Sequence, residues 1–178
     1  RDTIRDMTHA LNEDGLRVLV VATRRQAAPG RAYGVADEQG LTAVGCLAFL
    51  DPPKDTAHTA IAALHQHGVA VKVITGDNEA VTRKICGEVG LDVTHSALGR
   101  DLEDLDDAAF DATVARTTVF AKMSPLQKAR VVTSLQRQGH TVGFLGDGIN
   151  DAPALRQADV GISVDTATDI AKESADII

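Results

Sequence analysis

The sequence contains few aromatic residues: 178 residues include no tryptophan, one tyrosine and four phenylalanines. A core built from this chain must therefore rest on Val, Ala, Leu and Ile, a composition that suits parallel strands covered by helices. There are only two cysteines, Cys46 and Cys86, which provide no disulfide framework and are typical of a reducing compartment. We interpret both as small apolar residues that are buried or half-buried.

Long apolar runs and an excess of basic charge are also missing. No stretch approaches the roughly 20 apolar residues needed to cross a bilayer, and residues 1–10 are too polar for a signal peptide. The net charge of −7 argues against a nucleic-acid surface, which needs a basic face. The six histidines show no metal-ligand spacing. The length allows one full domain and part of another.

The most informative segment that is present is Gly-Asp-Gly-Ile-Asn-Asp-Ala-Pro at residues 146–153, directly after the apolar stretch Thr141–Leu145. A buried strand that ends in two carboxylates delivers oxygen ligands to one edge of a sheet, and Mg²⁺ needs only one or two carboxylates plus a phosphate oxygen. We predict that Asp147 binds Mg²⁺, that Asp151 binds the metal or orients its water, and that Asn150 donates to phosphate. An isolated Gly-Asp-Gly is more often a simple turn, but the full eight residues favour the site.

Two further segments predict phosphate binding. Thr75-Gly76-Asp77 follows the apolar stretch Val69–Ile74, and a hydroxyl with backbone N–H groups at the end of a strand can hold a phosphoryl group. Lys128 lies one turn inside a helix that begins at Ser124-Pro125, where its ammonium could neutralise phosphate oxygens. A lone lysine on such a helix is more often solvated, so the prediction depends on the three segments together.

Hydrophobic periodicity predicts strands that alternate with helices, and therefore an α/β fold with a parallel sheet. Residues 27–40 are expected to form a loop with a short extension at 33–36. The predicted helices are 2–13, 56–66, 79–89, 125–138, 152–157 and 168–173, of which the second, third and fourth are closed by Gly68, Gly90 and Gly139; the predicted strands are 16–23, 41–50, 69–74, 118–121, 141–145, 160–163 and a last one from Ala175.

The acidic segment Arg100–Ala115 permits two interpretations. Six aspartates and glutamates could form a cation site, but they interleave with Leu102, Leu105 and Phe110 at helical spacing and show no fixed ligand geometry. We therefore expect a solvated helix.

Taken in order, the Thr75-Gly76-Asp77 motif, Lys122 with Lys128 six residues later, and the motif at 146–153 resemble the phosphorylation domain of P-type cation-transporting ATPases, a branch of the haloacid dehalogenase superfamily. The resemblance extends from about Asp51 to the C-terminus. It implies a Rossmann-like parallel sheet of the haloacid dehalogenase type at 55–178, a hinge at 51–54, and the C-terminal part of a nucleotide-binding domain at 1–50.

The resemblance also implies roles for individual residues. ATP and Mg²⁺ are the expected cofactors. Arg17, within Gly15-Leu16-Arg17-Val18-Leu19, is similar to the arginine that contacts the phosphates of ATP, and Lys122 is expected on the nucleotide side of the site. Thr75 and Gly76 would hydrogen-bond the phosphoryl oxygens, Lys128 would offset their charge, and Asp77 would lie near the nucleotide or its metal.

The family's nucleophile, the aspartate of an Asp-Lys-Thr-Gly-Thr motif on the central strand, does not occur in these 178 residues. We therefore expect the chain to be a cytosolic piece of a longer membrane pump. By itself it should be soluble and inactive, and its partners should be ATP, the other domains of the pump and the transported cation. How a fold without its central strand is maintained is left open.

The transported ion is indicated by one local similarity. Gly161-Ile162-Ser163-Val164-Asp165 resembles the magnesium-transporting branch, and a calcium pump is the alternative. Two other classes remain: a soluble dehalogenase-type phosphatase, which needs its own nucleophile aspartate, and a non-catalytic interaction module, which would tolerate changes at Thr75, Lys128 and Asp147.

Overall fold

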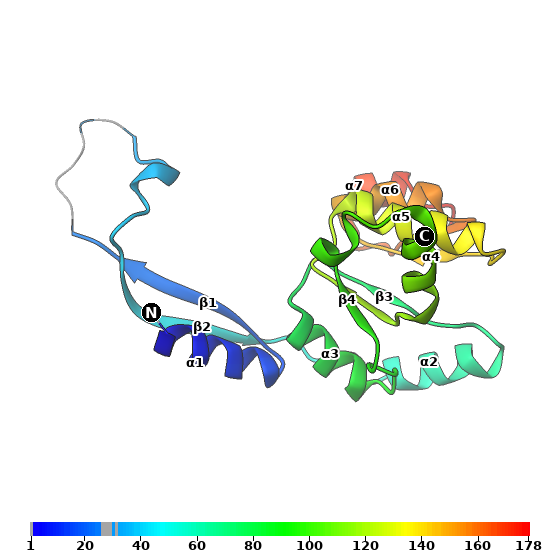
Figure 1. Ribbon diagram of the computed structural model, residues 1–178, viewed down its shortest axis with the longest axis horizontal. Helices are drawn as coiled ribbons and strands as arrows, with labels where there is room; N and C mark the ends of the chain where they lie inside the picture. Colours follow the sequence, from blue (N-terminus) through cyan, green and yellow to red (C-terminus); the bar gives the residue numbers. More distant parts are fainter. Residues whose placement is uncertain (1, 26–29, 31) are drawn as a thin grey trace. The chain divides into compact units, whose positions relative to one another are not determined.

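The computed structural model describes residues 2–25, 30 and 32–178 (Figure 1). The chain divides into two compact units, Arg1–Pro52 and Pro53–Ile178. Their boundary lies within the segment 51–54 that was predicted as a hinge, where two consecutive prolines remove backbone donors and restrict φ. Within the described residues, no helix has the length and apolar character that crossing a membrane demands.

The first unit is a helix followed by an antiparallel strand pair. Its elements are α1 (Asp2–Glu13), β1 (Leu16–Thr23), a 3₁₀ helix η1 (Val35–Asp37) and β2 (Thr42–Leu50). β1 and β2 pair from Leu16 opposite Leu50 to Thr23 opposite Thr42. The predicted helix 2–13 and strands 16–23 and 41–50 are confirmed, and η1 overlaps the predicted short extension at 33–36. Residues 27–29 and 31 of the predicted loop lie outside the described residues.

The second unit contains parallel strands alternating with helices, which confirms the α/β prediction. β3 (Val73–Ile74), β5 (Val119–Ala121) and β4 (Ser96–Leu98) form one parallel sheet in the order β3-β5-β4. β6 (Gly143–Leu145) and β7 (Val160–Ile162) form another, which Ile177 extends by a parallel bridge to Ile162. The sequence predicted one parallel sheet; the described strands of this unit form two, with β3 and β6 each at the end of its sheet.

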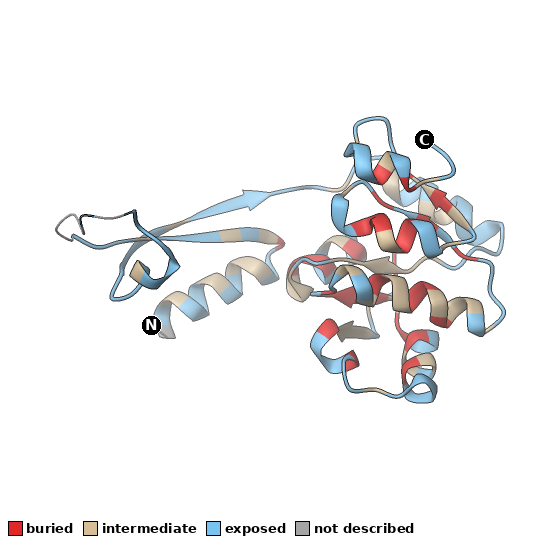
Figure 2. Cartoon of the chain, turned by 90° about the horizontal axis from the view of Figure 1, so that it is seen from above, coloured by how far each residue is buried: buried red, intermediate tan, exposed pale blue. Residues whose placement is uncertain are grey.

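Helices surround these sheets, and their packing supplies the core (Figure 2). They are α2 (Ala57–Gln66), α3 (Glu79–Glu88), η2 (Gly99–Leu102), α4 (Asp107–Arg116), α5 (Pro125–Arg137), η3 (Ile149–Asp151), α6 (Ala152–Gln157) and α7 (Asp169–Glu173). One cluster centres on Phe110, Phe120 and Val131, and a second on Phe144 and Leu155. Because Ile74 and Leu135 pack against both clusters, the two sheets share one hydrophobic core.

Several predictions of individual elements were wrong. The predicted buried strand 69–74 is reduced to Val73–Ile74, and Val69 is exposed, because the strand is paired only where it meets the short β5. The stretch 141–145 was predicted to be buried throughout, but its residues alternate between buried and exposed. β4 and η2 were not predicted. Cys46 is half-buried and Cys86 is buried, as expected.

Gly161 provides a test of this packing. A Cβ atom at this position would lie 2.7 Å from the carbonyl oxygen of Leu155, which belongs to the backbone of α6. We expect Gly161→Ala to lower the free energy of unfolding by about 1–3 kcal/mol, the usual cost of overpacking. Gly143→Ala on the neighbouring strand is the control, because its Cβ would approach Val160 O no closer than 3.9 Å. Urea unfolding that gives equal stability for the two variants would contradict the packing described here.

Candidate phosphate and magnesium site

The Thr75-Gly76-Asp77 motif forms a tight turn at the carboxyl end of β3. Thr75 Oγ1 accepts a hydrogen bond from Asp77 N at 3.0 Å, so the motif closes on itself. Its backbone is held by the segment after β5: Met123 N donates to Thr75 O at 2.9 Å and Lys122 N donates to Asp77 O at 3.1 Å. The carboxyl ends of β3 and β5 are therefore joined by backbone hydrogen bonds. These bonds bring Thr75-Gly76-Asp77 next to the segment that leads into the helix of Lys128.

Lys122 has a backbone conformation that is uncommon for a residue with a side chain. Its φ is 55°, in the left-handed region. Such a conformation costs of order 1–3 kcal/mol and persists only where the surroundings fix it. The bond to Asp77 O provides that restraint, and a Cβ on Gly99 would lie 2.5 Å from Lys122 O, so only glycine allows this approach. The side chain of Lys122 is exposed next to the turn at Asp77.

Lys128 is placed by a well-formed helix start. Ser124 Oγ accepts from Gln127 N at 3.3 Å and Gln127 Oε1 accepts from Ser124 N at 2.8 Å, a reciprocal cap, and Pro125 takes the first helical position. The predicted start of this helix is confirmed. Lys128 follows in the first turn and is buried, with 8% of its surface exposed.

The ammonium group of Lys128 pairs with Asp151 in the interior. Lys128 Nζ lies 2.6 Å from Asp151 Oδ1, and the two side chains are 10% and 13% exposed. The other oxygen, Asp151 Oδ2, accepts from Gly148 N at 3.1 Å. A buried charge needs a partner, and this pair supplies one to each residue. It also joins two motifs that are 23 residues apart in the sequence.

Glycine at position 146 allows Asp151 to take this place. A Cβ at Gly146 would lie 2.6 Å from Asp151 Cβ, so any larger residue would displace the carboxylate. Gly146 is fixed in turn by Ser163, whose buried hydroxyl donates to Gly146 O at 2.9 Å. Sequence reasoning missed Ser163; the available signal was a hydroxyl residue at the end of an otherwise apolar strand.

Asp147 lies beside this pair in the sequence but in a different environment. It is exposed, and its backbone oxygen accepts from Thr168 N, the cap of α7, at 3.1 Å. Its carboxylate therefore faces solvent at the end of β6, and Asn150 is exposed as well. Among the described residues, no group of three or more His, Cys, Asp or Glu side chains is arranged to hold a metal ion.

The carboxylates of Asp147 and Asp151 nevertheless fit a Mg²⁺ site. The ion keeps several waters and is commonly bound through one or two carboxylates together with substrate phosphate. Asp147 offers an exposed carboxylate, and Asp151 Oδ2 retains a lone pair after accepting from Gly148. Arg17 lies on β1 of the other unit, opposite Phe49, and its predicted contact with ATP stays a prediction.

Comparison with known proteins places these observations in a family. A family model described as haloacid dehalogenase-like hydrolase matches residues 14–159. The chain is 55% identical over its whole length to "Magnesium-transporting ATPase, P-type 1" of Salmonella typhimurium, covering 20% of that protein. It is 53% identical over 98% of its length to the protein of the same name from Escherichia coli, again covering 20%.

A more distant relative is "Probable cation-transporting ATPase F" of Mycobacterium bovis, which is 40% identical over the whole chain, with 21% of that protein covered. The chain thus spans about a fifth of the length of the curated relatives it matches. These similarities confirm the resemblance that the motifs predicted.

Proposed function

The chain belongs to the haloacid dehalogenase-like hydrolase family, and we propose that it is the greater part of the phosphorylation domain of a P-type, ATP-driven cation pump. The observation that carries the proposal is the buried Lys128–Asp151 pair, which joins the phosphate-binding helix start to the turn bearing Asp147. Residues 1–50 would then be the end of the nucleotide-binding domain, and the pump would present both at the cytosolic face of the membrane.

The proposed roles rest on the resemblance together with the positions of these residues. When bound, Mg²⁺ neutralises the charge of a transferring phosphoryl group, and the remaining catalysis is mostly positioning. Asp147 and Asp151 hold the ion, while Asn150 donates to the phosphate. Thr75 and the N–H groups of its turn hydrogen-bond phosphoryl oxygens, and the ammonium of Lys128 offsets their charge.

The remaining predicted site residues are proposed to contact the nucleotide. Lys122 and Asp77 would contact ATP, together with residues of the pump outside this sequence. Supporting this, Lys122 N donates to Asp77 O, so these two exposed residues lie next to each other on the segments that follow β5 and β3. Arg17 belongs to the other unit and is a separate candidate for a phosphate contact, on the resemblance alone. The phosphorylated aspartate would come from a further strand, which we place between β3 and β6 because these strands end their respective sheets and carry two of the motifs.

The transported ion is proposed to be Mg²⁺. The relatives named as magnesium-transporting are 53–55% identical to this chain, while the one named only as cation-transporting is 40% identical. The segment Gly161–Asp165 favours the same ion. A calcium pump remains the alternative.

A magnesium titration of this chain, followed by two-dimensional NMR, tests the site. We expect Mg²⁺ to shift the amide signals of residues 146–151, and inorganic phosphate added afterwards to shift those of Thr75–Asp77 and Lys128. Ca²⁺ serves as the comparison ion, since it tolerates more irregular coordination. Mg²⁺ that leaves residues 146–151 unperturbed would refute the proposed metal site and favour a non-catalytic interaction module.

A further inference from the structure

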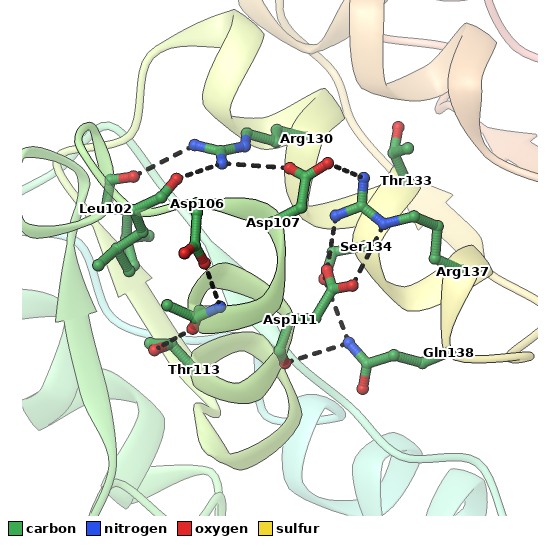
Figure 3. Close-up of polar contacts among 12 residues, drawn as sticks. Leu102, Asp106, Asp107, Asp111, Thr113, Arg130, Thr133, Ser134, Arg137 and Gln138 are labelled. Atoms are coloured by element: carbon green, nitrogen blue, oxygen red, sulfur yellow. Dashed lines mark hydrogen bonds and ion pairs between the residues drawn. The ribbon is translucent and has the colours of Figure 1, made fainter.

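The acidic helix α4 is bound along one side of α5, the helix that carries Lys128 (Figure 3). We propose that Asp111 is a positioning residue: by fixing α5 through Ser134 and Arg137, it holds the ammonium of Lys128 where a phosphoryl group can be bound. The inference rests on the function proposed above for Lys128. It replaces the expectation that 100–115 is merely a solvated helix.

Asp111 is bound by two residues of α5 at once. Ser134, which is fully buried, donates from Oγ to Asp111 Oδ1 at 2.5 Å. Arg137 donates from Nη2 to Asp111 Oδ1 at 2.7 Å and from Nε to Asp111 Oδ2 at 3.2 Å, so the guanidinium binds the carboxylate in a bidentate way. Charge-assisted bonds of this kind are the stronger hydrogen bonds in proteins. The hydrogen bonds from Arg137 and then Ser134 lower the pKa of Asp111, so its carboxylate stays charged at neutral pH.

Further contacts extend this attachment along α5. The side-chain amide of Gln138 donates to Asp111 O at 3.2 Å and to Ser134 Oγ at 3.1 Å. Arg130 lies with its guanidinium 4.0 Å from the ring centre of Phe110 and donates to Leu105 O at 2.7 Å. Arg130, Ser134 and Arg137 are spaced by four and three residues, so one face of α5 meets α4 over two turns.

Lys128 projects from a different face of the same helix. At 3.6 residues per turn, it is rotated by about 200° from Arg130, two residues later. It therefore points away from α4 and toward Asp151 on η3. A hydrogen-bonded helix turns as a unit, so fixing one face by Asp111 sets the direction in which Lys128 leaves the other. Misplacement by about 1 Å is enough to impair a group that must meet a reacting atom.

Amine labelling of the full 178-residue chain, read by mass spectrometry, measures the placement of Lys128 directly. In the native protein Lys128 is 8% exposed and should react slowly, while Lys84, whose side chain is 48% exposed, provides an internal reference. We expect Asp111→Ala to raise the labelling of Lys128 relative to Lys84 about tenfold, since it removes several bonds to a charged group. Asp111→Asn keeps an acceptor for Ser134 and should give a smaller increase.

The matched control is Asp106→Ala on the same helix. Asp106 caps α4, accepting from Ala109 N at 2.8 Å, so its loss weakens the helix without removing the bonds to α5. Labelling of Lys128 should stay near the native rate. Equal labelling in the Asp106 and Asp111 variants would overturn the proposal, because the effect would then be general destabilisation.

Arg137→Met breaks the same attachment from α5 and serves if Asp111→Ala fails to fold. It should raise Lys128 labelling severalfold, and an unchanged rate would equally overturn the proposal. Labelling requires neither phosphate nor Mg²⁺. A positive labelling result with no phosphate-induced shifts would therefore remove the proposed role of Lys128 and leave its positioning by Asp111 intact.

Discussion

Asp147→Asn is expected to weaken Mg²⁺ binding by this chain about 100-fold or more, because loss of a hydrogen-bond partner behind a metal ligand already costs 10–100-fold and loss of the ligand itself should cost more. The fold should not change. Asp147 is exposed and its hydrogen bonds with Thr168 use the backbone oxygen, which asparagine retains. The free energy of unfolding should stay within about 0.5 kcal/mol of native.

The measurement is a Mg²⁺ titration by NMR or calorimetry, with urea unfolding run in parallel. Asp104→Asn is the matched control, because it removes the same charge from an exposed position on the acidic segment. In a longer polypeptide that includes the phosphorylated aspartate, Asp147→Asn should abolish phosphoenzyme formation. Near-native Mg²⁺ affinity in the variant would show that Asp147 is not the ligand.

Features that depend on neighbours in the sequence were predicted well. Ser124 caps α5, at the predicted start of that helix. Asn78, the residue directly before the predicted helix 79–89, caps α3 by accepting from Ala80 N at 2.9 Å. Gly68, Gly90 and Gly139 end their helices with φ of 75°, 83° and 85°. These are local effects: a short polar side chain satisfies the first N–H groups of a helix, and glycine adopts the left-handed conformation at its end.

Some features that depend on distant segments were not predicted. β4 is only three residues long and begins with serine, so no alternating pattern marks it, and its strand conformation depends on pairing with β5. The attachment of α4 to α5 joins Asp111 to residues 23 and 26 positions away. An acidic helix carries the same sequence pattern whether its carboxylates meet water or arginine, so only the fold distinguishes the two.

The candidate site contains both kinds of feature, those set by neighbours in the sequence and those set by distant segments. The sequence nominated Lys128 and Asp151 separately, from a helix start and from a metal-binding motif. It did not indicate that the two side chains would meet, that Gly146 would leave room for Asp151, or that Ser163 would hydrogen-bond Gly146. Those relations arise where α5 packs beside the turn after β6, which local patterns do not encode.

Removing one partner of the Lys128–Asp151 pair should strongly destabilise this unit. Lys128→Met and Asp151→Leu are each expected to lower the free energy of unfolding by about 3–5 kcal/mol, because each leaves an uncompensated charge in the interior. Urea unfolding followed by the amide signals of residues 53–178 measures this unit separately from residues 1–52, which need not unfold in the same transition.

The double variant distinguishes a buried ion pair from simple loss of packing. Removing both charges leaves no unpaired group, and a buried pair replaced by apolar residues is often neutral in stability. The double variant should therefore be more stable than either single variant, although it would lack the ammonium proposed to bind phosphate.

Lys84→Met is the control: its partner Glu88 is 47% exposed, and breaking such a surface pair costs only about 0–1 kcal/mol. Single variants at Lys128 and Asp151 that cost no more than Lys84→Met would show that the pair is solvated, and the proposed site would then lose the contact that joins its two halves.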